Sequence, residues 1–311
     1  MIDSELLARA GKMIREGGVV AFPTETVYGL GANALDARAV ERIFEIKRRP
    51  ASSPLIVHVD CANMARSLAA DWPDAAEQLA IAFWPGPLTL VLPKQPRIPD
   101  IVTAGLATVG LRHPNHPVAE ALIREAGVPI AAPSANRFTG LSPTTAEHVL
   151  KSLGGEVDLI LDGGPTHVGI ESVVLALASS RPRLLRPGTI SRDEIEAIVG
   201  EIDVGPIELE GSHPSPGLHD KHYSPLTPLF LVYGEQLPTR GRGAYLWLTE
   251  PLPAGYSEQM PADAAGYAAV LYETLHRLDD RGFDWIAVER PPQWPEWAGV
   301  LDRLDRASNR K

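Results

Sequence analysis

The stretch Val19-Val20-Ala21-Phe22-Pro23-Thr24-Glu25-Thr26-Val27-Tyr28-Gly29-Leu30 joins a short apolar run to a strongly polar one. The apolar part, 19–22, predicts a short buried strand. The two threonines, the carboxylate and the tyrosine that follow offer hydrogen-bond donors and acceptors at the end of that strand, where ligand sites gather. A turn that hydrogen-bonds to itself explains the same residues equally well, so both interpretations stay open.

Outward from this stretch, helical and strand patterns alternate. Apolar residues recur at helical spacing between Leu6 and Ile14, and Gly17-Gly18 ends that helix. Asp36 can cap a second helix. Further strands are expected at 55–59, 88–92, 108–111, 129–132, 159–161, 172–177 and 184–185, with helices at 116–125 and 144–153. Strands and helices mixed in this way predict a layered α/β fold.

The character of the chain changes near residue 205. The segment 206–228 is rich in proline and lacks periodicity, so it is expected to be a linker. Beyond it, strands are expected at 229–232 and 285–288 and helices at 264–278 and 298–307. We therefore predict two domains, residues 1–205 and 229–311, joined by the linker 206–228.

Composition narrows the classes of function. The 311 residues carry a net charge of −10 with a pI near 5.4, which excludes a general basic surface for nucleic acid. An anionic ligand must then be held by a local cluster of basic groups and backbone amides. No stretch approaches the roughly 18–20 apolar residues that span a bilayer, and the N-terminus does not resemble a signal peptide. We therefore expect a cytoplasmic protein.

The sequence does not match the common motifs for nucleotide or metal binding. Residues 29–34 fit a loose dinucleotide fingerprint, but they do not follow the strand directly. Residues 164–169 begin like a P-loop, but the lysine that must follow is missing. His113 and His116 lack further ligands nearby and are expected to be structural or solvent-facing. The single cysteine, Cys61, excludes a disulfide framework and is expected to be a buried small residue rather than a nucleophile.

Basic and polar residues gather at three further places. Lys47-Arg48-Arg49-Pro50 closes a helix, where cations either complement the helix dipole, by roughly 0.3–1 kcal/mol, or converge on a polyphosphate. Ser134 and Asn136 follow an apolar strand and either cap the next element or bind a phosphate. Arg112 and Arg186 end apolar strands, where a guanidinium needs a substrate anion or a structural ion pair.

Together, and in this order, these segments resemble the YrdC/Sua5 family of threonylcarbamoyl-AMP synthases over the whole chain. The family pattern is followed by 23–30, Lys47-x-Arg49-Pro50, 83–89, Ser134-x-Asn136, Arg186-Pro187-Gly188 and, in the linker, Ser215-Pro216-Gly217 and His222-Tyr223-Ser224-Pro225. Two departures stand out: Ser53 replaces an asparagine common in the family, and 218–220 differ from the linker consensus.

The resemblance implies a fold and a reaction. The N-terminal domain should be a YrdC-like twisted, open mixed sheet with a deep basic groove, and the C-terminal Sua5 domain a small, Rossmann-like α/β unit. The linker should fold over the groove as a lid. L-threonine, bicarbonate and ATP would give L-threonylcarbamoyladenylate, diphosphate and water, for the threonylcarbamoyladenosine (t6A) modification of tRNA. Mg²⁺ would accompany ATP as cofactor.

The resemblance also implies the site. The threonine site would comprise Thr26, His58, Arg112, Ala132 and Ser172. The ATP site would comprise Lys47, Arg49, Ser53, Thr108, Ser134, Asn136, Ser142, Arg186 and Tyr223. In catalysis, Lys47 and Arg49 would neutralise phosphate charge, Arg112 would hold the threonine carboxylate as a bidentate pair, and Tyr223 would close over the nucleotide. No metal held by protein side chains alone is expected.

Two other functions were weighed. Carbamoyltransferases of hydrogenase maturation share a YrdC-like domain, but their zinc-finger segments need more than one cysteine. A non-catalytic protein that binds double-stranded RNA or the ribosome would use the positive groove, which the net charge of −10 disfavours. The expected partners are L-threonine, ATP, bicarbonate and a tRNA threonylcarbamoyl transferase that receives the product. RNA contact is the remaining candidate, and no membrane partner is expected.

Overall fold

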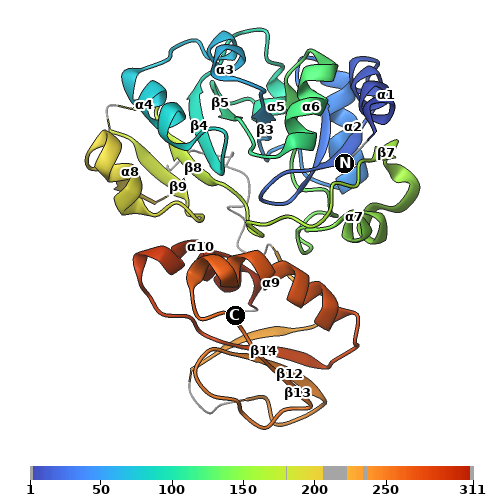
Figure 1. Cartoon of the computed structure of the whole chain (residues 1–311), viewed down its shortest axis with the longest axis vertical. Helices are drawn as coiled ribbons and strands as arrows, with labels where there is room; N and C mark the ends of the chain where they lie inside the picture. Colours follow the sequence, from blue (N-terminus) through green and yellow to red (C-terminus); the bar gives the residue numbers. More distant parts are fainter. Residues whose placement is uncertain (1–2, 180, 206–222, 234–236, 309–311) are drawn as a thin grey trace.

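The computed structural model describes residues 3–179, 181–205, 223–233 and 237–308 and has a larger and a smaller unit (Figure 1). The larger unit contains every described element up to residue 205, and the smaller one begins at Leu229. Of the predicted linker, residues 206–222 lie outside the described part. Only its end, 223–228, is seen, leading into the smaller unit.

A mixed sheet of ten strands, counted over the described residues, forms the larger unit, in the order β10-β9-β8-β4-β5-β3-β6-β2-β1-β7. The strands are β1 (Val20–Pro23), β2 (Tyr28–Asn33), β3 (Ile56–His58), β4 (Leu88–Pro93), β5 (Thr108–Arg112), β6 (Ile130–Ala131), β7 (Leu159–Ile160), β8 (Val173–Ala176), β9 (Arg183–Arg186) and β10 (Asp203–Val204). Neighbouring pairs are parallel, as in β3–β5, or antiparallel, as in β4–β5. The expected mixed sheet is confirmed.

Helices cover both faces of this sheet. They are α1 (Ser4–Arg15), α2 (Ala37–Lys47), α3 (Ala62–Leu68), α4 (Asp74–Phe83), α5 (Asp100–Thr103), α6 (Pro117–Ala126), α7 (Ala146–Leu153) and α8 (Arg192–Val199), with a 3-10 turn, η1, at Gly154–Glu156. Side chains of a strand alternate between faces. Phe22 of β1 therefore packs with α1 and α6, whereas Ala21 joins the core that contains α2. Asp36 caps α2 as predicted.

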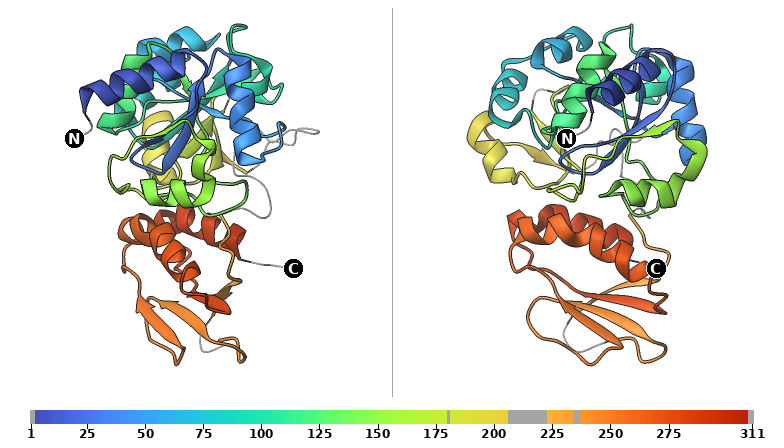
Figure 2. Two further views of the ribbon diagram at one scale, coloured as in Figure 1. Left: turned by 90° about the vertical axis from the view of Figure 1, so that its right-hand side faces the viewer. Right: turned by 45° about the vertical axis from the view of Figure 1, so that its right-hand side comes forward.

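The smaller unit is a four-stranded parallel sheet in the order β11-β14-β12-β13. Its elements are β11 (Leu229–Val232), β12 (Gly243–Trp247), β13 (Tyr256–Gln259), α9 (Ala264–Asp279), β14 (Trp285–Glu289), η2 (Pro295–Trp297) and α10 (Ala298–Ala307). In both views of Figure 2, α9 and α10 lie between this sheet and the larger unit. The expected small α/β unit is thus docked through its helices.

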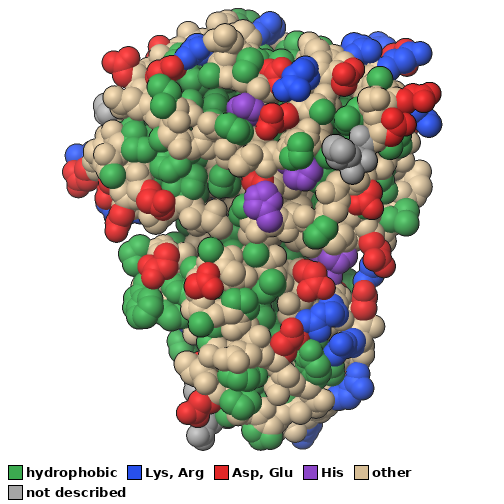
Figure 3. All heavy atoms as spheres, viewed as in Figure 1, with side chains coloured by type: hydrophobic (Ala, Val, Ile, Leu, Met, Phe, Trp, Pro, Cys, Tyr) green, Lys and Arg blue, Asp and Glu red, His purple; other side chains and the backbone are tan. Residues whose placement is uncertain are grey.

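The two units share an apolar interface. Val27, Leu141 and Ile170 of the larger unit join the core cluster of the smaller one. Contact with α9 is close: a Cβ atom at Gly169, where φ is +80°, would lie 2.2 Å from the carbonyl oxygen of Ala268. Figure 3 shows the surface indented at one edge where the units meet. The interface therefore combines buried apolar area with direct backbone packing.

Several elements differ from the sequence prediction. The stretch that begins at Tyr28 was predicted as part of a polar turn, but it forms β2, which pairs antiparallel with β1. Only 24–27 remain as the connecting turn. The predictions also missed α3, α4, α5, α8, β10, β12 and β13. Most of these are short or lie where glycine, proline and polar residues obscure the periodicity.

Candidate active site

A pocket opens beside strands β3 and β5 of the larger unit. Its lining comprises Thr24, Thr26, Val27, Gly29, Arg49, Ile56, His58, Arg112, Ala132, Pro133, Ser134, Glu171, Arg186 and Tyr223. Eight of the residues implied by the sequence resemblance lie in this lining: Thr26, Arg49, His58, Arg112, Ala132, Ser134, Arg186 and Tyr223. The other six, Lys47, Ser53, Thr108, Asn136, Ser142 and Ser172, lie outside it. The fold thus brings together residues from distant parts of the chain.

The turn between β1 and β2 forms one wall. Thr24 Oγ1 donates to the carbonyl oxygen of Val27 (2.7 Å) and accepts from its backbone N–H (3.2 Å). Since that hydroxyl proton is used, Thr26 donates in the 2.8 Å contact between the two threonine hydroxyls. Both interpretations of this stretch therefore hold, because the turn bonds to itself and also lines the pocket.

Arg112 ends β5 and is almost fully buried. Its Nη2 donates to Thr26 Oγ1 (2.9 Å) and lies 2.7 Å from Glu25 Oε2, while Nε donates to the carbonyl oxygen of Gly86 (3.3 Å). The Glu25 contact is an ion pair that lacks hydrogen-bond geometry. A buried guanidinium needs such a partner. Arg112 is therefore positioned at the pocket by Glu25, the carboxylate of the polar stretch that follows the first strand.

His58 ends β3, directly opposite Arg112 in the strand register. Its ring meets Phe22 edge-on, with ring centroids 6.1 Å apart. Burial, reinforced by the charge of Arg112, lowers the pKa of His58 to about 3. Nδ1 has no hydrogen-bond partner among the residues that the structure describes. His58 therefore presents an uncharged imidazole to the pocket.

The end of α2 separates Lys47 from Arg49. Arg48 adopts a left-handed conformation (φ 51°), so the chain turns sharply after Lys47. Lys47 Nζ donates to the carbonyl oxygens of Ser134 and Asn136. Lys47 is not itself among the lining residues. Arg49 instead lines the pocket, with Nη2 donating to the carbonyl oxygen of Pro54 (3.2 Å). Of the two cations, Arg49 is the one in the lining, and their convergence on a polyphosphate stays a prediction.

Both cations are fully buried, which changes their acid–base behaviour. Burial, and then the charge of Arg49, lower the pKa of Lys47 well below its ordinary value. Burial lowers the pKa of Arg49 to about 10. Arg49 therefore keeps its positive charge near neutral pH and is better suited than Lys47 to bind an anion.

The loop after β6 carries Ser134 and Asn136. Ser134 lines the pocket and forms a backbone bridge to Gly29 of β2. The Asn136 side-chain amide donates to the carbonyl oxygens of Arg137 (2.9 Å) and Gly140 (2.8 Å). Asn136 therefore stabilises its own loop, which is the capping alternative, whereas Ser134 faces the pocket.

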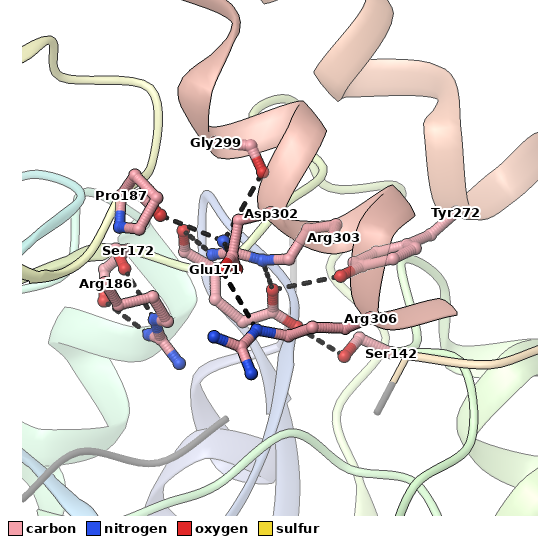
Figure 4. A network of polar contacts seen from close by, with 10 residues as sticks. All are labelled: Ser142, Glu171, Ser172, Arg186, Pro187, Tyr272, Gly299, Asp302, Arg303 and Arg306. Carbon is pink, nitrogen blue, oxygen red and sulfur yellow. Dashed lines mark hydrogen bonds and ion pairs between the residues drawn. The ribbon is translucent and has the colours of Figure 1, made fainter. Parts of the chain in front are cut away.

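The opposite wall contains Arg186 and Glu171, which Ser172 and Ser142 hold from behind. Arg186, at the end of β9, donates from Nε to the carbonyl oxygen of Ser172 (3.1 Å) and from Nη2 to its Oγ (3.3 Å). Ser172 Oγ also lies 2.8 Å from Thr89 Oγ1. Glu171 accepts from Ser142 Oγ at 2.5 Å (Figure 4). Ser142 and Ser172 thus hold residues of the lining without belonging to it.

Two predicted ATP residues lie further away. Thr108 lines a second, smaller pocket that shares Ile56 with the first. Ser53, on the loop after α2, is buried. The two pockets therefore have Ile56 of β3 as a common lining residue.

Tyr223 is the described linker residue that reaches the pocket. Its side chain is buried, its φ is 59°, and its ring stacks on Tyr272 of α9 with centroids 6.0 Å apart. Burial, and then the charge of Glu171, raise its pKa, so the hydroxyl stays protonated. The end of the linker therefore contributes an uncharged wall.

We also considered metal ligands, the single cysteine and helices that could cross a membrane, and none of them contributes to the pocket among the described residues. The described residues contain no group of three or more His, Cys, Asp and Glu side chains that could hold a metal. His116 instead caps α6, its Nδ1 accepting from the Val118 N–H (3.2 Å). The expectation of a buried Cys61 is wrong: it is exposed at the N-terminus of α3, where the chain leaves β3 for the surface. Within the described residues, no helix has the length and apolar character needed to cross a membrane.

Known proteins resemble both units. Residues 12–188 match the Sua5–YciO–YrdC family, described as telomere recombination, and residues 190–309 match the threonylcarbamoyl-AMP synthase C-terminal domain. The chain is 42% identical to the threonylcarbamoyl-AMP synthase of Bacillus subtilis, covering 97% of this chain and 92% of the relative. The Pyrococcus abyssi synthase is also 42% identical, with 96% and 93% covered. The crystal structure of Pyrococcus abyssi Sua5 complexed with L-threonine superposes with a TM-score of 0.92 at 39% identity, covering 99% of this chain and 95% of that one.

Proposed function

Since this chain belongs to the Sua5/YrdC family of threonylcarbamoyl-AMP synthases, we propose that the pocket described above is its active site. The enzyme converts L-threonine, bicarbonate and ATP into L-threonylcarbamoyladenylate, diphosphate and water, for tRNA modification. The observation that carries the assignment is the convergence of three buried arginines, Arg49, Arg112 and Arg186, on one pocket of a chain whose net charge is −10. The RNA-binding alternative is not favoured.

Threonine binds at the end of the pocket formed by Thr26, His58 and Arg112. The Arg112 guanidinium pairs with the amino-acid carboxylate, a geometry that suits a bidentate contact. Thr26 supplies a hydroxyl partner, Ala132 a backbone partner, and the neutral His58 an uncharged hydrogen-bonding group. Ser172, which the family resemblance adds to this site, lies behind the lining and holds Arg186. Support comes from the Pyrococcus abyssi relative, whose structure contains L-threonine.

ATP binds along the rest of the pocket. Arg49 and Arg186 neutralise the phosphates, and Ser134 of the same lining offers them a hydroxyl. The neighbouring pocket with Thr108 takes the nucleoside end. Lys47, Ser53, Asn136 and Ser142 act from behind the lining; Lys47 does so by fixing the loop that carries Ser134. Lys47 therefore aligns the phosphate site, in addition to the direct contact that the family resemblance implies.

The reaction joins two anions, so charge neutralisation and alignment are the main catalytic tasks. The threonine amine and bicarbonate form a carbamate with loss of water, and the carbamate oxygen then attacks the α-phosphorus of ATP. A new P–O bond forms to the carbamate oxygen, and the bond from the α-phosphorus to the oxygen that bridges to the β-phosphate breaks, so that diphosphate leaves. Arg49 and Arg186 hold the phosphates while Arg112 fixes the threonine, and no covalent nucleophile is required.

Mg²⁺ enters with ATP rather than in a site of the protein's own. Among the described lining residues the carboxylate is Glu171, and its oxygens already accept from Ser142, Tyr272 and Arg303. Mg²⁺ prefers oxygen ligands and keeps several waters, often with substrate phosphates. The residues present do not fit a protein-held magnesium site, and we assign no catalytic step to one.

Closure and delivery complete the proposal. The pocket holds only about 50 Å³, against the roughly 300–1,000 Å³ of ordinary ligand sites, so part of its wall moves when substrates bind. Tyr223, from the linker 206–228 between domains 1–205 and 229–311, is the wall residue suited to open and close. Closure would shield the hydrolysable adenylate from water until a transferase in the cytoplasm takes it over. Contact with RNA would belong to that transfer step.

Two substitutions test the assignment by substrate. Arg112→Lys keeps the charge but loses the planar fork, so the KM for threonine should rise about 10–100-fold with little change in the KM for ATP. Arg49→Ala should instead raise the KM for ATP with little change in the KM for threonine. Arg66→Ala, which removes a surface arginine paired with Glu77, serves as the control. The assay is steady-state pyrophosphate release. Equal effects of Arg112→Lys and Arg49→Ala on both substrates would contradict the separate sites.

A further inference from the structure

The smaller unit places one arginine against the pocket wall. Arg303 of α10 is 1% exposed and reaches across the interface, where its Nε donates to Glu171 Oε2 at 2.7 Å (Figure 4). Its Nη2 and Nη1 donate to the carbonyl oxygens of Glu171 (3.0 Å) and Pro187 (2.9 Å). One guanidinium from the smaller unit therefore fixes both the side chain and the backbone of a pocket-lining residue.

Glu171 is an unexpected residue for a pocket that binds anions. Its carboxylate lines the same pocket as Arg49 and Arg186. Burial alone would raise its pKa, but the charges of Arg303 and Arg186, with the Ser142 hydrogen bond, hold the pKa at about 2. Glu171 is therefore ionised, and its charge must be balanced if ATP is to bind beside it.

Three groups balance Glu171, and two of them come from the smaller unit. Arg303 supplies the charge, and Tyr272 of α9 donates from its hydroxyl to Oε2 (3.1 Å). Ser142 of the larger unit donates a hydrogen bond from its hydroxyl to Glu171 Oε1. The charge of Arg186, which lines the pocket itself, also acts on Glu171, so without Arg303 this carboxylate depends more on an arginine of the pocket.

Arg303 also supports the wall residue from the linker. Its guanidinium lies over the Tyr223 ring, 5.3 Å from the ring centroid, and Tyr223 stacks on Tyr272. A buried cation over an aromatic face is attracted to the negative charge of the ring face. The same arginine thus contacts Glu171 and Tyr223, which both line the pocket.

We propose that Arg303 is a positioning residue through which the smaller unit sets the affinity for ATP: it neutralises Glu171, so that Arg186 serves the substrate instead of the protein's own carboxylate. The inference rests on the proposed placement of ATP in this pocket. ATP is a polyanion and threonine a zwitterion without net charge. An uncompensated Glu171 therefore weakens ATP binding far more than threonine binding.

The test measures dissociation constants for ATP and for threonine by calorimetry, which does not depend on turnover. Arg303→Met should raise the Kd for ATP at least about tenfold, or about 1.4 kcal/mol, and that for threonine less than about threefold. The double variant Glu171→Gln/Arg303→Met removes both charges and should bring the Kd for ATP back to within about threefold of wild type. Arg290→Met is the control. Arg290 follows β14 and pairs with Asp305 of α10 (2.6 Å), and no contact joins it to Glu171.

The double variant decides the matter even where Arg303→Met does not fold, because it removes the Glu171 charge together with that of Arg303. Asp302, which also pairs with Arg303 (2.8 Å), keeps Arg306 as its partner (3.0 Å). A tenfold loss of ATP affinity in a folded double variant would overturn the inference, as would wild-type affinity in a folded Arg303→Met. Pyrophosphate release by the wild-type enzyme is measured alongside. If threonine does not stimulate that release, the proposed function fails, while the ATP affinities still show whether Arg303 acts through the charge of Glu171.

Discussion

The charge state of His58 is set by its surroundings. Burial and the neighbouring Arg112 lower its pKa from 6.5 to about 3 in the folded protein. The unfolded chain takes up a proton near pH 6.5, whereas the folded chain does not until about pH 3, so acid favours unfolding. The stability due to the neutral imidazole is therefore complete above about pH 6.5 and is lost progressively as the pH falls toward 3.

His58→Gln should flatten this dependence. Because each pKa unit corresponds to about 1.4 kcal/mol, the free energy of unfolding of the wild type should fall by about 2 kcal/mol more than that of the variant between pH 7 and pH 5. Urea denaturation at a series of pH values measures the two slopes. His276, whose pKa is lowered to about 4, contributes equally to both proteins. Parallel curves would show that His58 is not the titrating group.

The residues that could be found from sequence are those with a local signal. Arg112 and Arg186 end apolar strands, where a guanidinium needs a partner, and the structure places both in the pocket lining. Glu171 has no such local signal, because its role in the pocket depends on its ion pair with Arg303, which is 132 positions away in the sequence. Lys47 is the opposite case. Its residue type and spacing suggest a phosphate ligand, but where its ammonium group points depends on the loop that carries Ser134.

Among the elements, the β1–β2 hairpin shows what tertiary packing adds. Residues 19–22 were predicted as a strand from their apolar run, and β1 is confirmed there. Its partner β2 was missed because Gly29 and Gly31 weaken a strand pattern. Gly31 is required by packing, since a Cβ atom there would lie 2.6 Å from the Phe22 ring. The glycine that hides the strand is thus the one that lets its partner's aromatic ring fit.

Helix α10 depends on a similar close approach. A Cβ atom at Gly299 would lie 2.6 Å from the carbonyl oxygen of Gly188, a backbone atom that cannot rotate away. Gly299→Ala should therefore push α10 from the larger unit, cost about 1–3 kcal/mol of stability and weaken ATP binding through Arg303. Gly155→Ala, where nothing lies within 4 Å, is the matched control. Thermal unfolding and ATP calorimetry measure both effects, and a neutral Gly299→Ala would refute the tight contact.

At the scale of the whole molecule, the two units form one functional structure. The apolar interface includes Val27, the last residue of the β1–β2 turn, and Ile170, next to Glu171, so the smaller unit packs directly behind two walls of the pocket. Sequence patterns predicted two α/β units and their order along the chain. They could not predict how the units dock, because docking depends on pairs such as Glu171 and Arg303 that local periodicity does not connect.

The most direct test of the account follows pyrophosphate release from ATP by the purified enzyme while threonine and bicarbonate are supplied separately and together. The account predicts release only when both are present, since the carbamate that attacks the α-phosphorus contains both. Release without threonine, or release that ignores bicarbonate, would contradict it.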